Sequence, residues 1–243
     1  MDNKSKILVL VEGEKTDHKL MQHLLSIYGI DSNHEIVSYN TNIYTLYNEM
    51  FRDDNPDSLD ILQVLKMHEN DTEKKKIFDY YYSDILLIFD LDPHDSQFSP
   101  SKITRMLEHF QESSDMGKLY INYPMVESFY HMKSIPDDAY NSYIATLDEL
   151  KKKLYKTRVA SENRNHDYRK FAVNKDECNT VIKQNIEKAH LISGFKNSVE
   201  VDTEEALEIL SRQLTKLDQE QALSILCTCV FYIADYNSKL IEA

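Results

Sequence analysis

The chain has 243 residues, 42% of them hydrophobic and 28% charged, which is typical of a globular protein and not of a disordered one. The 41 acidic residues outnumber the 28 basic ones, and the resulting net charge of −13 excludes a uniformly basic nucleic-acid coat. Only four glycines are present and no GxGxxG or GxxxxGK[ST] pattern occurs, which argues against a dinucleotide site or a P-loop.

In the first half of the chain, short apolar runs alternate with segments of helical spacing. The runs that predict strands are 6–11, 35–39, 85–89 and 118–122. The segments that predict helices are 16–28, 42–51, 59–68, 100–112 and 124–132. Gly29 stands where the first helix would end, and Ser99-Pro100 forms a start signal for a later one. This alternation predicts an α/β fold with a mostly parallel sheet flanked by helices.

Beyond residue 135 the sequence shows only helical periodicity. The segments concerned are 137–155, 176–190, 203–215 and 219–240. We therefore expect an α/β domain over 1–135 and a helical C-terminal region over 136–243. Apolar residues fall on one side of the last helix, which predicts burial in its own core, in a homodimer or against a partner protein. They are Leu223, Leu226, Val230, Ile233 and Leu240.

The cysteines indicate the compartment. Cys178, Cys227 and Cys229 form no CxxC pair, and an odd number gives no disulfide framework. We interpret them as reduced core thiols of a soluble cytoplasmic protein. No run of 18 apolar residues occurs, so we expect no membrane partner.

Carboxylates follow the predicted strands. They are Glu12, Glu14, Asp90, Asp92, Asp95 and Glu127. Ligand sites of open α/β sheets form beyond the carboxyl ends of the strands, so these acids are expected to converge there. Asp90 and Asp92 would share a face if the strand continued through them. Clustered carboxylates repel one another unless a cation or shared protons neutralise them. All-oxygen ligands favour Mg²⁺ or Mn²⁺ over zinc. The alternative is that these aspartates only start turns or cap helices.

Three blocks resemble the Toprim domain of topoisomerases, primases and bacterial nucleases of the OLD and RloB types. Leu10-Val11-Glu12-Gly13-Glu14-Lys15-Thr16-Asp17 is similar to the opening Glu-Gly strand end. Phe89-Asp90-Leu91-Asp92-Pro93-His94-Asp95 resembles the Asp-x-Asp block. Tyr123-Pro124-Met125-Val126-Glu127-Ser128-Phe129-Tyr130-His131 is similar to a third block, Pro-x-x-Glu before an aromatic helix. The resemblance covers residues 5–132 and leaves the C-terminal half unassigned.

The resemblance implies a Toprim-like, Mg²⁺-dependent nuclease with a role in bacterial anti-phage defence. Glu12 would act as general acid/base or metal ligand, and Asp90 and Asp92 would hold the metal. Glu127 would be a further ligand, and Glu14 or Asp95 could help hold a second ion. The alternative is a non-catalytic Toprim-like regulatory or accessory subunit that binds a partner protein.

Residues 151–175 are locally basic, with nine Lys and Arg residues against two acidic ones. Together with Lys15, this segment is the predicted nucleic-acid-binding surface, for either DNA or RNA. Its candidate residues are Lys151, Lys152, Lys153, Lys156, Arg158, Arg164, Arg169 and Lys170. Four ring side chains are interleaved with these cations and predict phosphate contacts with base stacking: Tyr155, His166, Tyr168 and Phe171. The alternative is a solvated helix face.

Two histidines lie close to the predicted acidic residues. His94 is a candidate ligand, proton carrier or polar turn residue. His131 follows Glu127 by four residues, which would place both on one side of the predicted helix, and we expect it to be a hydrogen-bonded core residue.

Overall fold

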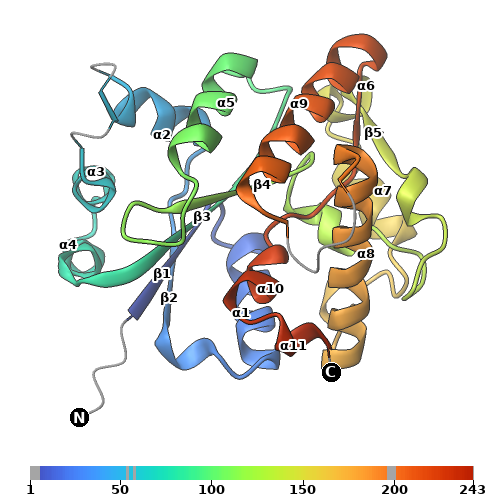
Figure 1. The fold of residues 1–243 in the computed structure, drawn as a ribbon, viewed down its shortest axis with the longest axis horizontal. Coiled ribbons are helices and arrows are strands. Elements are labelled where there is room, and N and C mark those ends of the chain that lie inside the picture. Colours follow the sequence, from blue (N-terminus) through green and yellow to red (C-terminus); the bar gives the residue numbers. More distant parts are fainter. Residues whose placement is uncertain (1–5, 53–54, 57–58, 196–200, 243) are drawn as a thin grey trace. The chain divides into compact units, whose positions relative to one another are not determined.

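The computed structural model describes residues 6–52, 55–56, 59–195 and 201–242. It is an α/β protein, 53% helical and 15% strand, with a four-stranded, all-parallel sheet in the order β2-β1-β3-β4 (Figure 1). The strands are β1 (Lys6–Val11), β2 (His34–Ser38), β3 (Tyr82–Asp90) and β4 (Lys118–Asn122). The predicted fold class is thus confirmed, and all four predicted sheet strands are present.

The central strands carry continuous buried apolar runs, residues 7–11 of β1 and 85–89 of β3, as expected for strands covered on both faces. Val9 of β1 is fully buried and is paired with Ile36 of β2 on one side and Leu86 of β3 on the other. Parallel pairing brings the carboxyl ends of β1 and β3 to the same edge of the sheet. The residues that follow these two strands are therefore the ones that an open α/β sheet uses for ligands.

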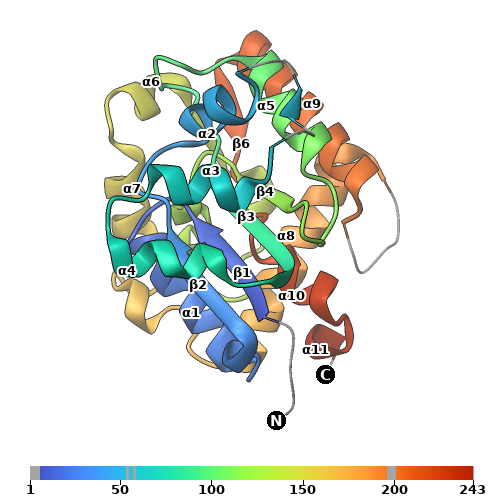
Figure 2. The same ribbon diagram turned by 90° about the vertical axis from the view of Figure 1, so that its left-hand side faces the viewer.

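The chain divides into two compact units, of which the first comprises residues 1–89 and 99–120. Its helices are α1 (Thr16–Ile27), α2 (Ile43–Met50), α3 (Ile61–His68), α4 (Thr72–Lys75) and α5 (Pro100–His109). Helix α1 and the pair α3 and α4 lie on opposite sides of β1 and β2 (Figures 1 and 2). Gly29 has a φ of +65° just after α1, as the sequence predicts for a helix end.

The second unit comprises residues 90–98 and 121–243 and contains the C-terminal helices. Its helices are α6 (Leu147–Lys151), α7 (Tyr155–Glu162), α8 (Lys175–Ser193), α9 (Thr203–Glu220), α10 (Phe231–Tyr236) and α11 (Lys239–Glu242), with the 3₁₀ helix η4 (Val126–Tyr130). Strands β5 (Ile144–Thr146) and β6 (Ala222–Ser224) form an antiparallel pair. This division differs from the predicted boundary at residue 135, because 90–98 and 121–135 group with the C-terminal helices.

Three predicted helices are wrong in whole or in part. Residues 124–132 form only the short η4, and 137–155 contain β5 and α6 before α7 begins. Residues 219–240 form the end of α9, then β6 and α10. Leu223, Leu226, Val230 and Ile233 are fully buried. The continuous helix is therefore absent, and these four side chains are buried in the chain's own core, the first of the predicted alternatives.

The three cysteines are buried free thiols, in agreement with the sequence. Among the described residues, no helix combines the length and the apolar character that a membrane crossing requires.

Candidate functional site

Asp90 ends β3 and is held by the residues that follow β4. Its carboxylate is 7% exposed, and its Oδ1 accepts hydrogen bonds from the Val126 backbone N–H at 2.8 Å and from Asn122 Nδ2 at 3.4 Å. The Leu91 N–H donates to the Asn122 carbonyl at 3.1 Å. Asp90 therefore fixes the start of the η4 segment that carries Glu127.

Asp92 lies in a turn beyond the strand. Its φ is +40° and β3 ends at Asp90, so the strand does not continue through Asp92, and the condition under which Asp90 and Asp92 would share a face is not met. Its N–H donates to the Pro124 carbonyl at 3.3 Å, which ties this turn to the segment after β4. Burial raises the pKa of Asp92; Asp95 and Glu127 act in the same direction, whereas His94 and Lys156 oppose them. Charges from three chain segments therefore act on one carboxylate.

Among the described residues of the second unit, five buried side-chain atoms have no hydrogen-bond partner. Two are Ser128 Oγ and Arg158 Nε, and the other three, Asp92 Oδ1, His94 Nδ1 and Glu127 Oε2, belong to residues of the predicted site. Glu127 is only 3% exposed, so its second oxygen is shielded from bulk water. His94 Nδ1 lies 3.9 Å from Asp92 Oδ1, too far for a hydrogen bond. Buried polar atoms are nearly always satisfied, so unpaired ones in one part of a fold indicate a place for a ligand.

Lys156 brings the basic segment to these acids. Its Nζ lies 3.0 Å from Glu127 Oε1, and this pair joins α7 to η4. Partial burial lowers the pKa of Lys156, but Glu127, Asp90 and Asp92 together outweigh it and the net pKa is raised. Within the second unit, the predicted basic segment and the predicted acidic residues therefore meet at one ion pair.

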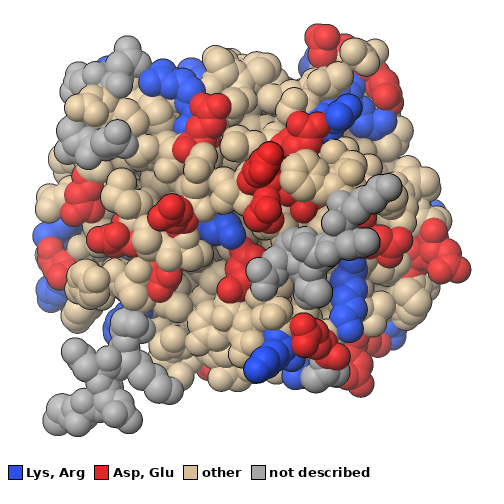
Figure 3. Space-filling view, in the orientation of Figure 1, with Lys and Arg blue, Asp and Glu red and all other residues tan. Residues whose placement is uncertain are grey.

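Four of the other eight cations of 151–175 form ion pairs with nearby acidic residues. Their pairs are Lys152–Asp148, Arg158–Glu149, Arg164–Glu177 and Arg169–Asp167. On the face drawn in Figure 3, Lys and Arg are interspersed with Asp and Glu. Lys151, Lys153 and Lys170 are exposed. The predicted base-stacking role is wrong for Tyr155 and Phe171, which are buried, whereas Tyr168 is half-buried and stacks on Tyr130 with ring centroids 4.2 Å apart.

The Glu-Gly block belongs to the first unit. Glu12 is half-buried directly after β1, and its N–H donates to the Ile88 carbonyl of β3 at 3.1 Å. Glu14 and Lys15 are exposed. Because Asp90 and Asp92 belong to the other unit, the convergence of Glu12 with them stays a prediction.

Asp95 has a clear local role. Its Oδ1 accepts a hydrogen bond from the Gln97 N–H at 2.7 Å, and the Phe98 N–H donates to its carbonyl at 3.1 Å. Asp95 thus forms the turn that the alternative interpretation foresees, while its charge still acts on Asp92. Its role as a metal ligand stays a prediction.

Among the described residues, no group of three or more His, Cys, Asp and Glu side chains is arranged to hold a metal ion. The donor chemistry of the second unit nevertheless fits a hard cation, since Asp92 and Glu127 each offer a buried carboxylate oxygen without a hydrogen bond. Comparisons with protein-family models, curated proteins and solved structures found no match. The Toprim resemblance thus rests on the three sequence blocks.

Sequence reasoning missed Asn122, which is fully buried at the end of β4. Its Oδ1 accepts the backbone N–H groups of Thr228 at 3.2 Å and Cys229 at 3.3 Å, while its Nδ2 donates to Asp90. Asn122 thereby joins residues far apart in the chain. The sequence did contain a feature that could have identified Asn122. It is a polar residue at the end of an apolar strand, as Asp90 is in β3.

The space around position 13 explains why the residue after Glu12 is a glycine. A Cβ at this position would lie 2.7 Å from Oδ2 of Asp17, whose side chain is buried at the start of α1. We expect Gly13→Ala to lower the free energy of unfolding by about 1–3 kcal/mol, because the crowded carboxylate must move. The effect is measured by urea unfolding of Gly13→Ala, of Asp17→Ala and of the double variant Gly13→Ala/Asp17→Ala. The double variant should recover part of the loss, and strictly additive effects would contradict the contact.

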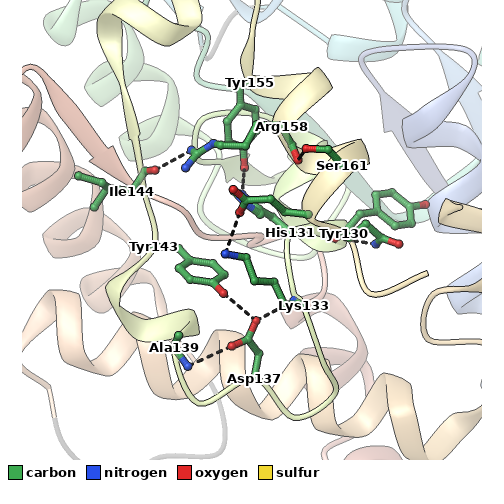
Figure 4. Close-up of polar contacts among 12 residues, drawn as sticks. Tyr130, His131, Lys133, Asp137, Ala139, Tyr143, Ile144, Tyr155, Arg158 and Ser161 are labelled. Atoms are coloured by element: carbon green, nitrogen blue, oxygen red, sulfur yellow. Dashed lines mark hydrogen bonds and ion pairs between the residues drawn. The ribbon is translucent and has the colours of Figure 1, made fainter. Parts of the chain in front are cut away.

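His131 follows the short 3₁₀ helix η4, so the predicted α-helix that would place it on one side with Glu127 is absent, and its ring belongs to a polar cluster with Tyr155 and Glu162. Figure 4 shows its ring close to Tyr155, with the Tyr143 hydroxyl directed toward Asp137. The Asp137 carboxylate also accepts the Lys133 backbone N–H, whereas Lys133 Nζ lies 3.4 Å from Glu162 Oε2. Its Nδ1 lies 3.3 Å from the Tyr155 hydroxyl and its Nε2 lies 3.1 Å from Glu162 Oε2. The predicted hydrogen-bonded core histidine is confirmed.

This histidine predicts an acid-sensitive fold. Burial lowers the pKa of His131 to about 4, against the opposing effect of Glu162. Below its ordinary pKa of 6.5 the unfolded chain takes up the proton first, so stability falls as the pH drops from 6.5 to about 4, by up to about 3 kcal/mol. Urea unfolding at several pH values should show a smaller loss for His131→Gln than for the wild type. Equal losses in both proteins would contradict this assignment.

Proposed function

We propose that this protein is a divalent-metal-dependent phosphodiesterase that cleaves nucleic acid, as the Toprim resemblance implies. The observation that carries the proposal is the pair of buried, unpartnered carboxylate oxygens, Asp92 Oδ1 and Glu127 Oε2, beyond the carboxyl ends of β3 and β4. Carboxylate oxygens placed there favour Mg²⁺ or Mn²⁺. A bound ion of this kind would polarise a phosphodiester, activate water and offset the charge of the transition state.

Each candidate site residue has a distinct role in this proposal. Asp92 and Glu127 supply metal ligands, and Asp90 orients the backbone that presents Glu127 by accepting the Val126 N–H. His94, whose Nδ1 has no hydrogen-bond partner and lies 3.9 Å from Asp92 Oδ1, is the proposed proton carrier. Glu12 is the proposed general acid/base at the end of β1. The roles of Glu14 and Asp95 at a second ion remain part of the same proposal.

Tyr168 supports nucleic acid, and not a small phosphate ester, as the substrate. Its half-buried ring stacks on the buried ring of Tyr130 with an interplanar angle of 6°, and Tyr130 lies in the same 3₁₀ helix as Glu127. Burial raises the pKa of Tyr168 to about 12, with Glu127 acting in the same direction, so its hydroxyl stays neutral near the acids. Exposed Arg169 and Lys170 follow it directly and can contact phosphates. A cytoplasmic setting and a role in defence against foreign nucleic acid belong to this proposal.

Incubation of the purified protein with plasmid, single-stranded DNA and RNA, with Mg²⁺, with Mn²⁺ and with a chelator, tests the proposal. We expect cleavage of at least one substrate that requires the metal and stops on chelation. Exposed Asp218 of α9 offers a control, because Asp218→Asn removes one negative charge away from the strand ends and should leave cleavage unchanged. Absence of cleavage under all conditions would favour the accessory-subunit alternative.

A further inference from the structure

Glu127 is a buried carboxylate that forms an ion pair with Lys156, a residue exposed at the surface. Its side chain is 4% exposed, whereas that of Lys156, 3.0 Å away, is 63% exposed. One Glu127 oxygen receives the ammonium group and the other has no hydrogen-bond partner. A buried carboxylate without a compensating charge is strongly destabilising, so the ammonium group stabilises this site as the structure stands.

The position of Lys156 is fixed by its neighbour. Tyr155 is buried at the start of α7, and its hydroxyl lies 3.3 Å from His131 Nδ1. This contact anchors the first turn of α7 against the segment that follows η4. Because the backbone is held there, Lys156 needs only side-chain rotation to leave Glu127 for solvent.

The positive charge of Lys156 also acts on Asp90 and Asp92. The same groups that would bind a divalent cation are thus already partly neutralised by a tethered one. A metal ion and an ammonium group cannot both lie against the same carboxylate without repelling each other.

We propose that Lys156 is a built-in counter-ion of the acidic site and that a divalent cation binds by displacing its ammonium group from Glu127. This inference rests on the proposed metal-dependent function and adds how the negative charge of the site is partly balanced before the metal arrives. It also implies that substitutions of Lys156 change the affinity for the metal, although Lys156 is not itself a ligand.

Calorimetric titration with Mg²⁺ and Mn²⁺ of the wild type and of Lys156→Met and Lys156→Arg tests this proposal. Lys156→Met should bind the metal about tenfold more tightly, because nothing has to be displaced. Lys156→Arg should bind it more weakly than the wild type, because a guanidinium group holds a carboxylate through two parallel hydrogen bonds. Lys152→Met is the matched control: it removes one positive charge from the same segment, where Lys152 pairs with Asp148, and should leave metal affinity unchanged.

Thermal unfolding gives a second readout that does not depend on cleavage. Without metal, Lys156→Met should melt at a lower temperature than the wild type, and added Mg²⁺ should raise its melting temperature more than that of the wild type. If the wild type binds metal and Lys156→Met binds it equally or more weakly, the counter-ion role is overturned while the proposed function stands. If no protein in the series binds metal, the proposed function fails and this inference fails with it.

Discussion

Replacing Asp92 by asparagine is expected to reduce metal-dependent cleavage by about a hundredfold or more while leaving the protein at least as stable as the wild type. The loss follows from removing a proposed charged ligand, because a bound metal ion would contribute several kcal/mol to phosphodiester cleavage. The stability follows from the site itself. Asp92 Oδ1 has no hydrogen-bond partner to lose, and burial disfavours its charge. Asparagine also tolerates the φ of +40° found at this position.

The cleavage assay is to be paired with thermal unfolding of Asp92→Asn and of the exposed control Asp218→Asn, both without metal. An inactive but equally stable or more stable Asp92→Asn variant is the signature of a residue kept for function at the expense of stability. A variant that stays active would remove Asp92 from the proposed site. A variant that is inactive because it unfolds would assign Asp92 to the framework of the fold.

Replacing Asn122 by alanine is expected to lower the free energy of unfolding by about 2–4 kcal/mol, a large share of the stability of an ordinary domain. The side chain is fully buried, and its loss leaves the N–H groups of Thr228 and Cys229 without their acceptor. Asp90 loses a donor at the same time. Urea unfolding, followed by circular dichroism, measures the effect, and the melting temperature should fall by roughly 5–15 °C.

Asn122→Asp is the companion variant. It keeps an oxygen acceptor for the two N–H groups but replaces the donor to Asp90 by a second carboxylate. We expect it to be more stable at acidic than at neutral pH relative to the wild type, because protonation relieves the repulsion between the two acids. If Asn122→Ala changes stability by less than about 0.5 kcal/mol, as surface substitutions do, the bridging role of Asn122 is contradicted.

The two central strands were predictable because β1 and β3 each contain a continuous apolar run, and a strand buried on both faces needs no other signal. The C-terminal segment misled the same reasoning. Leu223, Leu226 and Val230 follow helical spacing, yet they are fully buried in a strand and an irregular segment. Helical spacing is informative when the opposite face is exposed. Where nearly every residue is buried, the spacing no longer identifies the secondary structure.

The acids after β3 and β4 were also predictable, because their place depends on strand order alone. The contacts that organise them were not. Lys156 pairs with Glu127 through the packing of α7 against η4, and Asn122 reaches residues 228 and 229 through a fold that local sequence does not encode. The backbone of Asp92 was equally hidden, since a positive φ at a residue other than glycine has no strong sequence signature.

The central claim is that the acidic residues after β3 and β4 bind a divalent cation. Calorimetric titration of the purified protein with Mn²⁺ and Mg²⁺, with Asp92→Asn in parallel, tests it most directly. The account predicts saturable binding to the wild type that Asp92→Asn loses, although both proteins show the same circular dichroism spectrum. Equal binding by the two proteins, or none by either, would contradict it and would identify these carboxylates as turn-forming residues of the fold.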